Sequence, residues 1–461
     1  MLLTELLALL QKFQGVFSQE RVFVRVRRQA LGVLLALGSR TVARVLAAMG
    51  REQCDWSTEY RLFSRSPWHG RELFNPVLRE ALAFSGSDQE PLVVAGDFTH
   101  LPKTGKHIPQ VTCMRDPMSP AFHTNLIYGL RFFQLTLLCP FRAQHPALAT
   151  RSVPIRFDAV PVLPKPGKQA TEEEWKRYRQ KQKQRLTSKA ARETIEELRA
   201  DCDQAGAASR QLLVALDGSF CNRVFMETPI ARVDLLCRAR KDAVLCPPAG
   251  PQEKGFYGKK TFTPEQVRQD ESIPWQTTTL YYGGREHTLR YKEINSVHWQ
   301  RGGRRRKLRL LVLAPTGYRL HVRGRLLYRQ PAYLLTTDLK TPAAQLIVAY
   351  LDRWQIEVNH REEKSTLGVG DAQVRNKHSV PKQPAFVVAI YSMLLLAALK
   401  AYGPTRTQDY LPPPKWARRA ARPSCLDIVA LLRAQMAKDP AQLHRFEIET
   451  SAFDLLTKAA A

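Results

Sequence analysis

The amino-acid sequence predicts an α/β fold, in which a sheet-based core holds a β-rich insertion and is flanked by a helical region at each end. Three observations predict it. Short apolar runs bounded by turns are typical of buried strands in residues 91–239, hairpin patterns fill residues 240–336, and helical patterns dominate elsewhere. Strands that alternate with helices favour helices layered on a sheet. With 461 residues, 44% of them hydrophobic, the chain can bury a large core.

Residues 1–90 are predicted to form a helical N-terminal region that binds DNA. The pattern LLTELLALLQKF is helical, and so is SRTVARVLAAMG, which has Ser39 or Thr41 as its N-cap and Gly50 at its C-terminal end. A basic helical module suits docking on DNA, but the pattern does not identify a recognition helix.

Residues 91–239 are predicted to form the first part of the core. The runs PLVVAGD, LIYGLRFFQLTLLCP, QLLVALDGS and ARVDLLCRAR each read as a buried strand. Residues 171–201 lie between the second and third of these runs. They are charged, lack Gly and Pro, and are rich in helix-forming residues. We therefore expect one long surface helix that crosses between strands.

Residues 240–336 are predicted to form the β-rich insertion. TTLYY and HTLRYKE flank Gly283-Gly284, and RKLRLLVLA and YRLHVR flank residues 315–317, so two hairpins are expected. A basic run lies between these hairpins. Such a run is often a solvated loop, but the high net charge favours phosphate contacts by Arg304, Arg305 and Arg306.

Residues 337–378 are predicted to form a core helix, and residues 379–461 a helical C-terminal region. Thr341 and Pro342 read as the N-cap and first residue of one helix that closes near Gly368. The apolar run at 385–399 is shorter than the ~20 residues that span a bilayer, so a buried helix is expected there.

The charge balance indicates a polyanionic partner. The chain has 70 Lys and Arg against 42 Asp and Glu, which gives a net charge of +28. Nucleic acid is the first candidate and an anionic membrane surface the second. No export signal is evident, and the eight cysteines lack the spacing of a zinc site. We therefore expect a cytoplasmic protein that is associated with nucleic acid and not with a membrane.

Two carboxylates occupy matching places in two predicted strands. Asp97 follows the apolar run LVVAG, and Asp217 follows LLVAL. An Asp after a strand is usually a turn former or a helix cap, so each is weak evidence when taken singly. The pair becomes informative only if a third acidic residue joins it.

The predicted core helix supplies a third acid within a polar stripe. At ~100° per residue, the stripe spans an arc of about 60° and consists of Tyr350, Arg353, Glu357 and Lys364. Trp354 falls on the neighbouring apolar stripe, which is expected to be buried. A solvated stripe is the ordinary alternative, but a hydroxyl, a guanidinium, a carboxylate and an ammonium in line suit a phosphate ligand.

The spacing of these four residues resembles the YREK signature of bacterial insertion-sequence transposases in the DDE superfamily. The resemblance covers about residues 91–378 and implies an RNase H-like mixed-sheet core. It implies that three carboxylates converge as catalytic residues and metal ligands, namely Asp97, Asp217 and Glu357. It also implies that DNA phosphates are held by Tyr350, Arg353 and Lys364.

The resemblance also implies a reaction, cofactors and partners. Two Mg²⁺ ions ~3.5–4 Å apart would stabilise the anionic phosphorus centre, and Mn²⁺ can substitute for them. Family members nick transposon ends, form a hairpin through the new 3′-hydroxyl, reopen it and join the end to target DNA. The expected partners are double-stranded DNA with terminal inverted repeats and a second copy of the chain in a synaptic homodimer.

Several further residues are weaker candidates. Lys103 and Lys106 lie near Asp97 and are expected to contact phosphate, whereas His100 and His107 read as polar filler. Four aromatic residues of the insertion could receive an unpaired base, although core packing is their ordinary role: Trp275, Trp299, Tyr281 and Tyr282. The alternative functions are a non-catalytic DNA-binding regulator and an RNase H-like nuclease.

Overall fold

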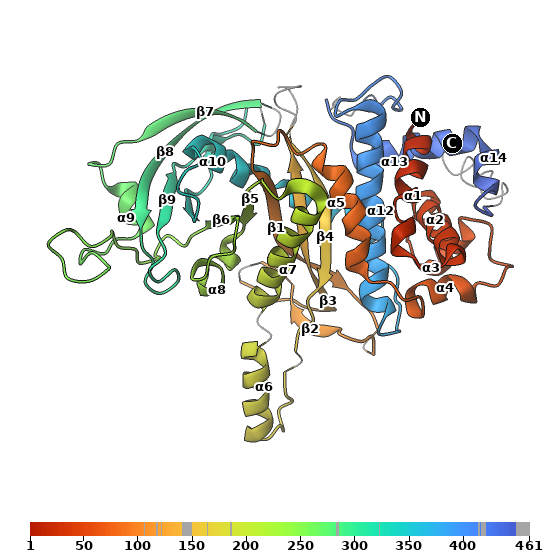
Figure 1. The fold of residues 1–461 in the computed structure, drawn as a ribbon, viewed down its shortest axis with the longest axis horizontal. Helices are drawn as coiled ribbons and strands as arrows, with labels where there is room; N and C mark the ends of the chain where they lie inside the picture. The colour runs from red at the N-terminus through yellow and green to blue at the C-terminus, as the bar shows by residue number, and fades with distance from the viewer. Residues whose placement is uncertain are drawn as a thin grey trace.

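The computed structural model describes the chain except for residues 106, 117–118, 121, 141–149, 164, 185–186, 283–284, 322, 414, 416–420 and 449–461. Within the described residues, one large mixed sheet forms the centre of the molecule. Helices cover it, and the helices of the two chain ends gather on one side, as Figure 1 shows. This architecture confirms the predicted α/β fold with an RNase H-like mixed sheet.

The first half of the sheet carries both predicted strand acids. Its strands are β1 (Leu92–Pro102), β2 (Thr112–Arg115), β3 (Leu126–Cys139), β4 (Arg151–Ala159), β5 (Leu212–Leu216) and β6 (Val233–Arg238). β3 runs antiparallel to β1, β2 and β4, whereas β5 is parallel to both β1 and β6. The four apolar runs that predicted strands all form strands here, because both faces of this sheet are covered.

The second half of the sheet comes from the segment predicted as a β-rich insertion. Its strands are β7 (Gln276–Tyr282), β8 (Arg285–Val297), β9 (Leu308–Leu313) and β12 (Ala332–Thr336). β12 pairs with β6, so these strands continue the core sheet. The predicted hairpin of β7 and β8 is present, with Tyr282 opposite Arg285, and its Gly283-Gly284 turn lies outside the described residues.

The second predicted hairpin is wrong. β9 pairs with β8 and β12, whereas the short strands β10 (Gly317–Tyr318) and β11 (Leu327–Tyr328) pair with each other. β9 is buried along its whole length. A fully buried strand needs a partner on each side, and the polar segment that follows β10 does not provide one.

The predicted core helix is two helices, α10 (Ala343–Asp352) and α11 (Gln355–Ser365). α10 contacts β5, β6 and β7, whereas α11 contacts β1, β3 and β4. The two helices therefore follow different parts of a twisted sheet. As a result Trp354, which was expected on a buried stripe, is 63% exposed at the break.

The start of α10 also differs from the prediction. Its N-cap is Pro342 and not Thr341, and no side chain caps the helix. The N–H groups of Lys340 and Thr341 instead donate to Oδ1 of Asp338, each at 2.8 Å. The turn before α10 is thus stabilised by an aspartate that comes earlier in the sequence.

The predicted crossover helix is also divided. It forms α6 (Glu172–Gln184) and α7 (Thr187–Cys202), with residues 185–186 outside the described part of the chain. α7 buries apolar side chains that include Ile195 and Leu198. α6 projects away from the rest of the molecule in Figure 1. The remaining short helices of this half are α8 (Arg223–Met226) and α9 (Pro264–Gln269).

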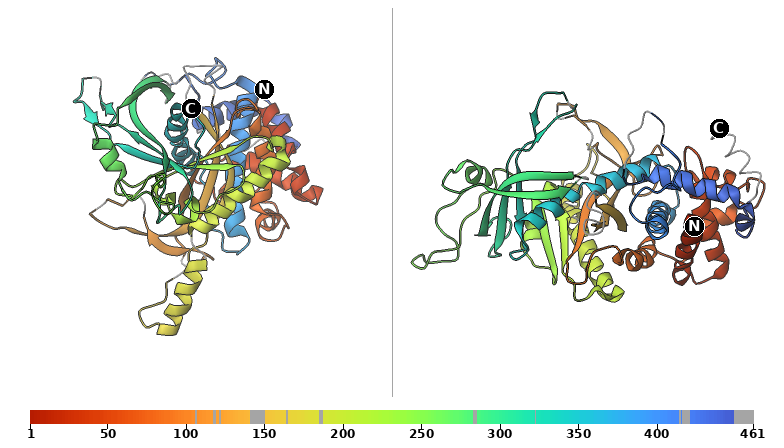
Figure 2. Two further views of the ribbon diagram at one scale, coloured as in Figure 1. Left: turned by 60° about the vertical axis from the view of Figure 1, so that its left-hand side comes forward. Right: turned by 90° about the horizontal axis from the view of Figure 1, so that it is seen from above.

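The two ends of the chain form one helical body (Figure 2). The N-terminal helices are α1 (Leu2–Gln11), α2 (Glu20–Leu35), α3 (Val42–Ala47), α4 (Ser57–Ser64) and α5 (Phe74–Leu82). The C-terminal helices are α12 (Ser379–Tyr402), α13 (Cys425–Lys438) and α14 (Pro440–His444). α1 contacts both α12 and α13. Thr41 caps α3, because its hydroxyl accepts from the Arg44 N–H at 3.2 Å.

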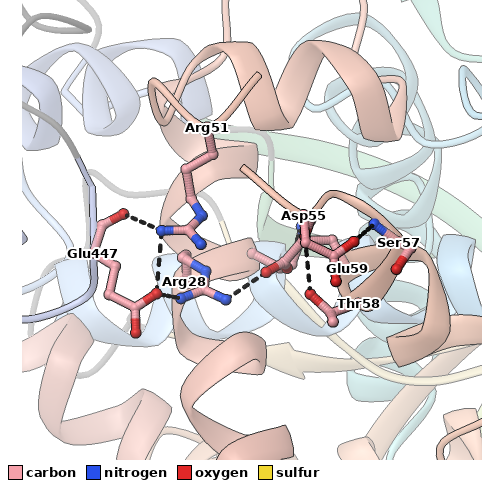
Figure 3. Close-up of polar contacts among 8 residues, drawn as sticks. Arg28, Arg51, Asp55, Ser57, Thr58, Glu59 and Glu447 are labelled. Carbon is pink, nitrogen blue, oxygen red and sulfur yellow. Dashed lines mark hydrogen bonds and ion pairs between the residues drawn. The ribbon is translucent and has the colours of Figure 1, made fainter. Parts of the chain in front are cut away.

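A buried ion cluster joins the end of the chain to the N-terminal helices (Figure 3). Arg28 of α2 is 4% exposed and pairs with both Glu59 of α4 and Glu447. Arg51 adds a second cation 3.1 Å from the Glu447 carboxylate. Gln29 donates to the other oxygen of Glu59 at 2.8 Å, so this buried carboxylate is satisfied on both oxygens.

The apolar run at 385–399 lies in α12, as expected for a buried helix. α12 is long and apolar enough to cross a membrane, but 83% of its most apolar window is buried inside the fold. Such burial is that of a core helix. The domain boundaries expected at residues 90, 239, 336 and 378 stay predictions.

Candidate active site

Asp97 and Asp217 lie at the same level on neighbouring parallel strands. Gly96 and Leu216 form the last registered pair of β1 and β5, and each aspartate follows immediately. Asp97 was expected at the end of its strand, but β1 continues to Pro102. Asp217 does follow the end of its strand, because β5 ends at Leu216. Since neighbouring strands lie ~4.8 Å apart, the two aspartates flank one point on the sheet.

Residues next to the two aspartates pack tightly on the other face of the sheet. A Cβ on Gly96 would lie 2.7 Å from Leu216 Cδ2 and 2.9 Å from Leu135 Cδ2, so the glycine allows both leucines to pack closely. The rings of Phe98 and Phe220 stack with centroids 5.1 Å apart. Because side chains alternate along a strand, these contacts lie on the face away from Asp97.

Glu357 belongs to the first turn of α11, which packs over β1, β3 and β4. Burial, followed by the negative charges of Glu357 and Asp217, raises the pKa of Asp97 to about 7, against the opposing effect of Arg353. The side chain of Asp97 is only 20% exposed. The three acidic residues that the sequence singled out therefore share one electrostatic environment.

The carboxylates have the chemistry of a divalent-metal site but not a closed geometry. Hard cations such as Mg²⁺ prefer carboxylate oxygens, and a cation would relieve the repulsion that raises the pKa of Asp97. However, the described residues contain no group of three His, Cys, Asp or Glu side chains placed to hold one ion. The expected convergence of three carboxylates on a metal position is thus not met by these side-chain positions.

Arg353 lies beside the acids as a buried cation with spare donors. Its Nη1 is 3.6 Å from Asp97 Oδ2, and its side chain is 11% exposed. Among the described residues, neither its Nε nor its Nη1 has a hydrogen-bond partner. Its guanidinium carbon lies 5.8 Å from the centroid of the Tyr350 ring, and burial raises the pKa of Tyr350. A buried guanidinium with free N–H groups is suited to hold an oxyanion.

The lysines expected to contact phosphate differ in position. Lys364 is exposed in the last turn of α11. Lys103 is 6% exposed, its Nζ donates to the carbonyl oxygens of Gly370 at 2.6 Å and Ala372 at 2.7 Å, and burial lowers its pKa to about 8. The structure thus gives Lys103 an anchoring role in place of the expected phosphate contact. Lys106 lies outside the described residues.

The three arginines of the basic run lie in different surroundings. Arg304 pairs with Glu227 at 2.5 Å, and Arg305 lies 5.6 Å from the centroid of the Phe256 ring. Arg306 is partly buried, which lowers its pKa. No contact recorded among the described residues joins these arginines to Asp97, Asp217 or Glu357.

The aromatic candidates are mostly engaged in packing. Trp275 has the Lys292 ammonium 4.7 Å from its ring centroid, and Tyr282 stacks on His287 at 4.0 Å. Trp299 packs closely over Gly302. The hydroxyl of Tyr281 is buried and lacks a partner within the described structure. His100 accepts from Arg131 Nε at 3.3 Å, and burial lowers its pKa to about 4, as suits polar filler.

A buried polar network behind Glu357 was missed by sequence reasoning. The Asn359 side chain accepts from Thr136 Oγ1 at 3.1 Å and Nδ2 donates to the Tyr391 hydroxyl at 3.0 Å. One turn later, Gln134 donates to Glu363 at 2.9 Å, and burial raises the pKa of Glu363 to about 8. In the sequence, the signal for this network was the spacing of Asn359 and Glu363, which lie four residues apart on a helix. A solvent-exposed polar face has the same spacing, so the pattern does not identify a buried network.

Comparison with known proteins places the chain in a nuclease class. A family model described as DDE superfamily endonuclease matches residues 17–306, which is more than half of the chain. The protein belongs to this family, whose members generally use divalent metal ions and act on DNA. The matched residues include Asp97 and Asp217 and end before Glu357, so the match does not reach the YREK spacing. A search of curated proteins finds no match.

Proposed function

We propose that the protein is a cut-and-paste DNA transposase with Asp97, Asp217 and Glu357 as its catalytic carboxylates. The observation that carries this proposal is the level placement of Asp97 and Asp217 on parallel strands, with Glu357 close enough to raise the pKa of Asp97. Membership of the DDE endonuclease family supports a nuclease or transposase reaction on DNA.

The residues divide the chemical tasks between them. When bound, two divalent ions, Mg²⁺ or Mn²⁺, supply Lewis-acid stabilisation of the attacking and leaving oxygens. The three carboxylates would hold these ions, and a bound cation would offset the repulsion that Glu357 and Asp217 exert on Asp97. Arg353 binds a non-bridging phosphate oxygen through its unpartnered N–H groups, while Tyr350 and Lys364 contact neighbouring phosphates.

The proposed reaction follows the family resemblance. Water cleaves one strand at a terminal inverted repeat and frees a 3′-hydroxyl, which attacks the opposite strand to form a hairpin. The hairpin is hydrolysed, and the 3′-hydroxyl then attacks target DNA. Two copies of the chain hold the paired ends, and the protein works on the bacterial nucleoid.

The test compares Asp97→Ala with Asp88→Ala, which removes an exposed carboxylate outside the site. The substrate is labelled DNA taken from the two borders of the open reading frame, where terminal inverted repeats are expected. Asp97→Ala should retain DNA binding and lose cleavage in Mg²⁺, whereas Asp88→Ala should cleave like the unaltered protein. Equal cleavage by both variants would remove Asp97 from the mechanism.

The products separate the transposase from the two alternatives. A denaturing gel should show a nick first, then a hairpin, and then a product joined to target DNA. Hydrolysis without a hairpin or a joined product would indicate an RNase H-like nuclease. Sequence-specific binding with no cleavage in Mg²⁺ or Mn²⁺ would indicate a regulator.

A further inference from the structure

A pocket opens where the N-terminal helical region meets the core. Its volume is ≈ 480 Å³, and its walls come from the segment after α4, the end of β4 and the first turns of α12. Figure 1 shows α4 beside the lower end of α12, and the two helices are in contact. No residue that the sequence singled out for DNA binding lines this pocket.

The pocket is strongly basic. Four exposed basic residues lie on it: Arg65, His69, Lys377 and His378. Arg71 and Lys382 add two more basic side chains to the lining. Asp158 is the carboxylate among the described lining residues, and burial raises its pKa. The cavity therefore favours an anionic ligand.

The basic residues have two different roles. Lys382 is buried, donates to Ser66 O at 2.8 Å and lies 5.1 Å from the centroid of the Trp68 ring, so it builds the wall. In contrast, the side chains of Arg65 and Lys377 have no hydrogen bond or ion pair within the described part of the chain. Two free cations at the mouth of a basic pocket are available to an outside partner.

The pocket lies close to the proposed catalytic residues. Asp97 is opposite Gln134 on β3, and Gln134 is opposite Phe157 on β4, which lines the pocket. At ~4.8 Å between neighbouring strands, Phe157 is about 10 Å from Asp97 across the sheet. Gln134 is 0% exposed and Phe157 2%, so a DNA strand that reached both sites would run over the surface, along a path longer than this span.

We propose that this pocket binds the sugar–phosphate backbone of the DNA strand that leaves the cleavage site. The inference rests on the proposed function and extends it by adding Arg65 and Lys377 as phosphate ligands. A polyanion fits better than a small free anion, because the free cations are exposed and come from two different segments of the lining. The net charge of +28 supports the same partner.

The test measures binding without catalysis. The double variant Arg65→Gln/Lys377→Gln is compared with Lys438→Gln/Arg445→Gln, which removes two exposed cations near α13 and α14. Both pairs use a fluorescein-labelled, mixed-sequence duplex in EDTA, with anisotropy titrations at several KCl concentrations. The pocket variant should lose about 0.9 from the salt slope for each phosphate contact removed, and affinity should fall about tenfold or more near 0.1 M salt.

The control variant should keep a salt slope close to that of the unaltered protein. The inference would be overturned if both variants kept the salt slope of the unaltered protein. It would also be overturned if both variants lost the same amount of slope. Thermal melting confirms that each variant is folded, since the altered side chains are exposed. If the pocket variant binds normally while Asp97→Ala abolishes cleavage, only the pocket inference fails. If Asp97→Ala cleaves normally, the proposed function fails and the binding result stands.

Discussion

The two strand acids and the helix acid reach the site in different ways. Asp97 and Asp217 are fixed by the parallel register of β1 and β5, with close packing beneath them at Gly96. Glu357 depends on a break between two helices and on a buried polar network behind α11. The strand half is therefore positioned by backbone register, whereas the helix half is positioned by side-chain hydrogen bonds. The four predictions below test this contrast.

The largest effect is expected from Arg353, which comes from the break in the helix half. Arg353→Ala removes a buried cation 3.6 Å from Asp97 and should lower cleavage by about 10²-fold or more, a loss typical of groups that stabilise transition-state charge. Arg353→Lys should not rescue activity, because an ammonium lacks the planar set of donors. The matched control is Arg361→Ala on the exposed face of α11. Equal activity of the two alanine variants in a single-turnover assay would contradict the role of Arg353.

The second effect concerns pH and the strand half. The pKa of Asp97 is raised to about 7 in the folded state, so ionisation destabilises the fold as pH rises from about 4 through 7. The loss amounts to about 4 kcal/mol at most by linkage. Asp97→Asn should therefore be more stable than the unaltered protein at pH 8 without metal, and equally stable near pH 3. Mg²⁺ should raise the melting temperature of the unaltered protein more than that of the variant. A stability difference that is independent of pH would refute the raised pKa.

The third effect tests the rigidity of the strand half. Gly96→Ala places a Cβ within 2.7 Å of Leu216 and should destabilise the fold by about 1–3 kcal/mol. Gly167→Ala is the control, because nothing lies within 4 Å of its Cβ position. Chemical denaturation measures both. If the two variants unfold at the same denaturant concentration, the strands are not as tightly packed as the contacts indicate.

The smallest effect tests the network behind the helix half. Asn359→Ala removes the acceptor of the Thr136 hydroxyl and one of the two partners of the Tyr391 hydroxyl, which still donates to Glu362, and should cost about 1–3 kcal/mol of stability. It should also raise the metal concentration needed for half-maximal cleavage, since α11 is held less firmly, while DNA affinity in EDTA is unchanged. Asn359→Asp tests whether the acceptor oxygen alone suffices. A fall in DNA affinity without any change in metal dependence would count against a positioning role for Asn359.

Much of the fold could be predicted because its signals are local. Buried strands need continuous apolar runs, and the runs before Asp97 and Asp217 form β1 and β5 as expected. The β7–β8 hairpin and the buried helix α12 also follow from local patterns. The placement of Asp97 and Asp217 follows from the same local signals. The apolar runs before them form two parallel strands, and the aspartates come at the same height along these strands.

The features that could not be predicted depend on distant partners. The helical periodicity of the sequence continues through Arg353 and Trp354 and does not indicate the break between α10 and α11. That break, which exposes Trp354, depends on the different strands that the two helices contact. Lys103 reads as a free cation until the carbonyls of Gly370 and Ala372 are brought to it by the fold. The pocket at Arg65 and Lys377 joins residues from opposite ends of the sequence, so no local pattern shows it.

The ion cluster around Arg28 has a consequence for the synthesis of the protein. One partner of Arg28 is on α4, and the other, Glu447, comes 419 residues after Arg28 in the sequence. The apolar faces of α1 and α2 also pack against α12 and α13. A nascent chain therefore carries an N-terminal bundle that lacks its closing helices until α12 and α13 have been made. The N-terminal helices should therefore reach their final packing only after the ribosome has released α13.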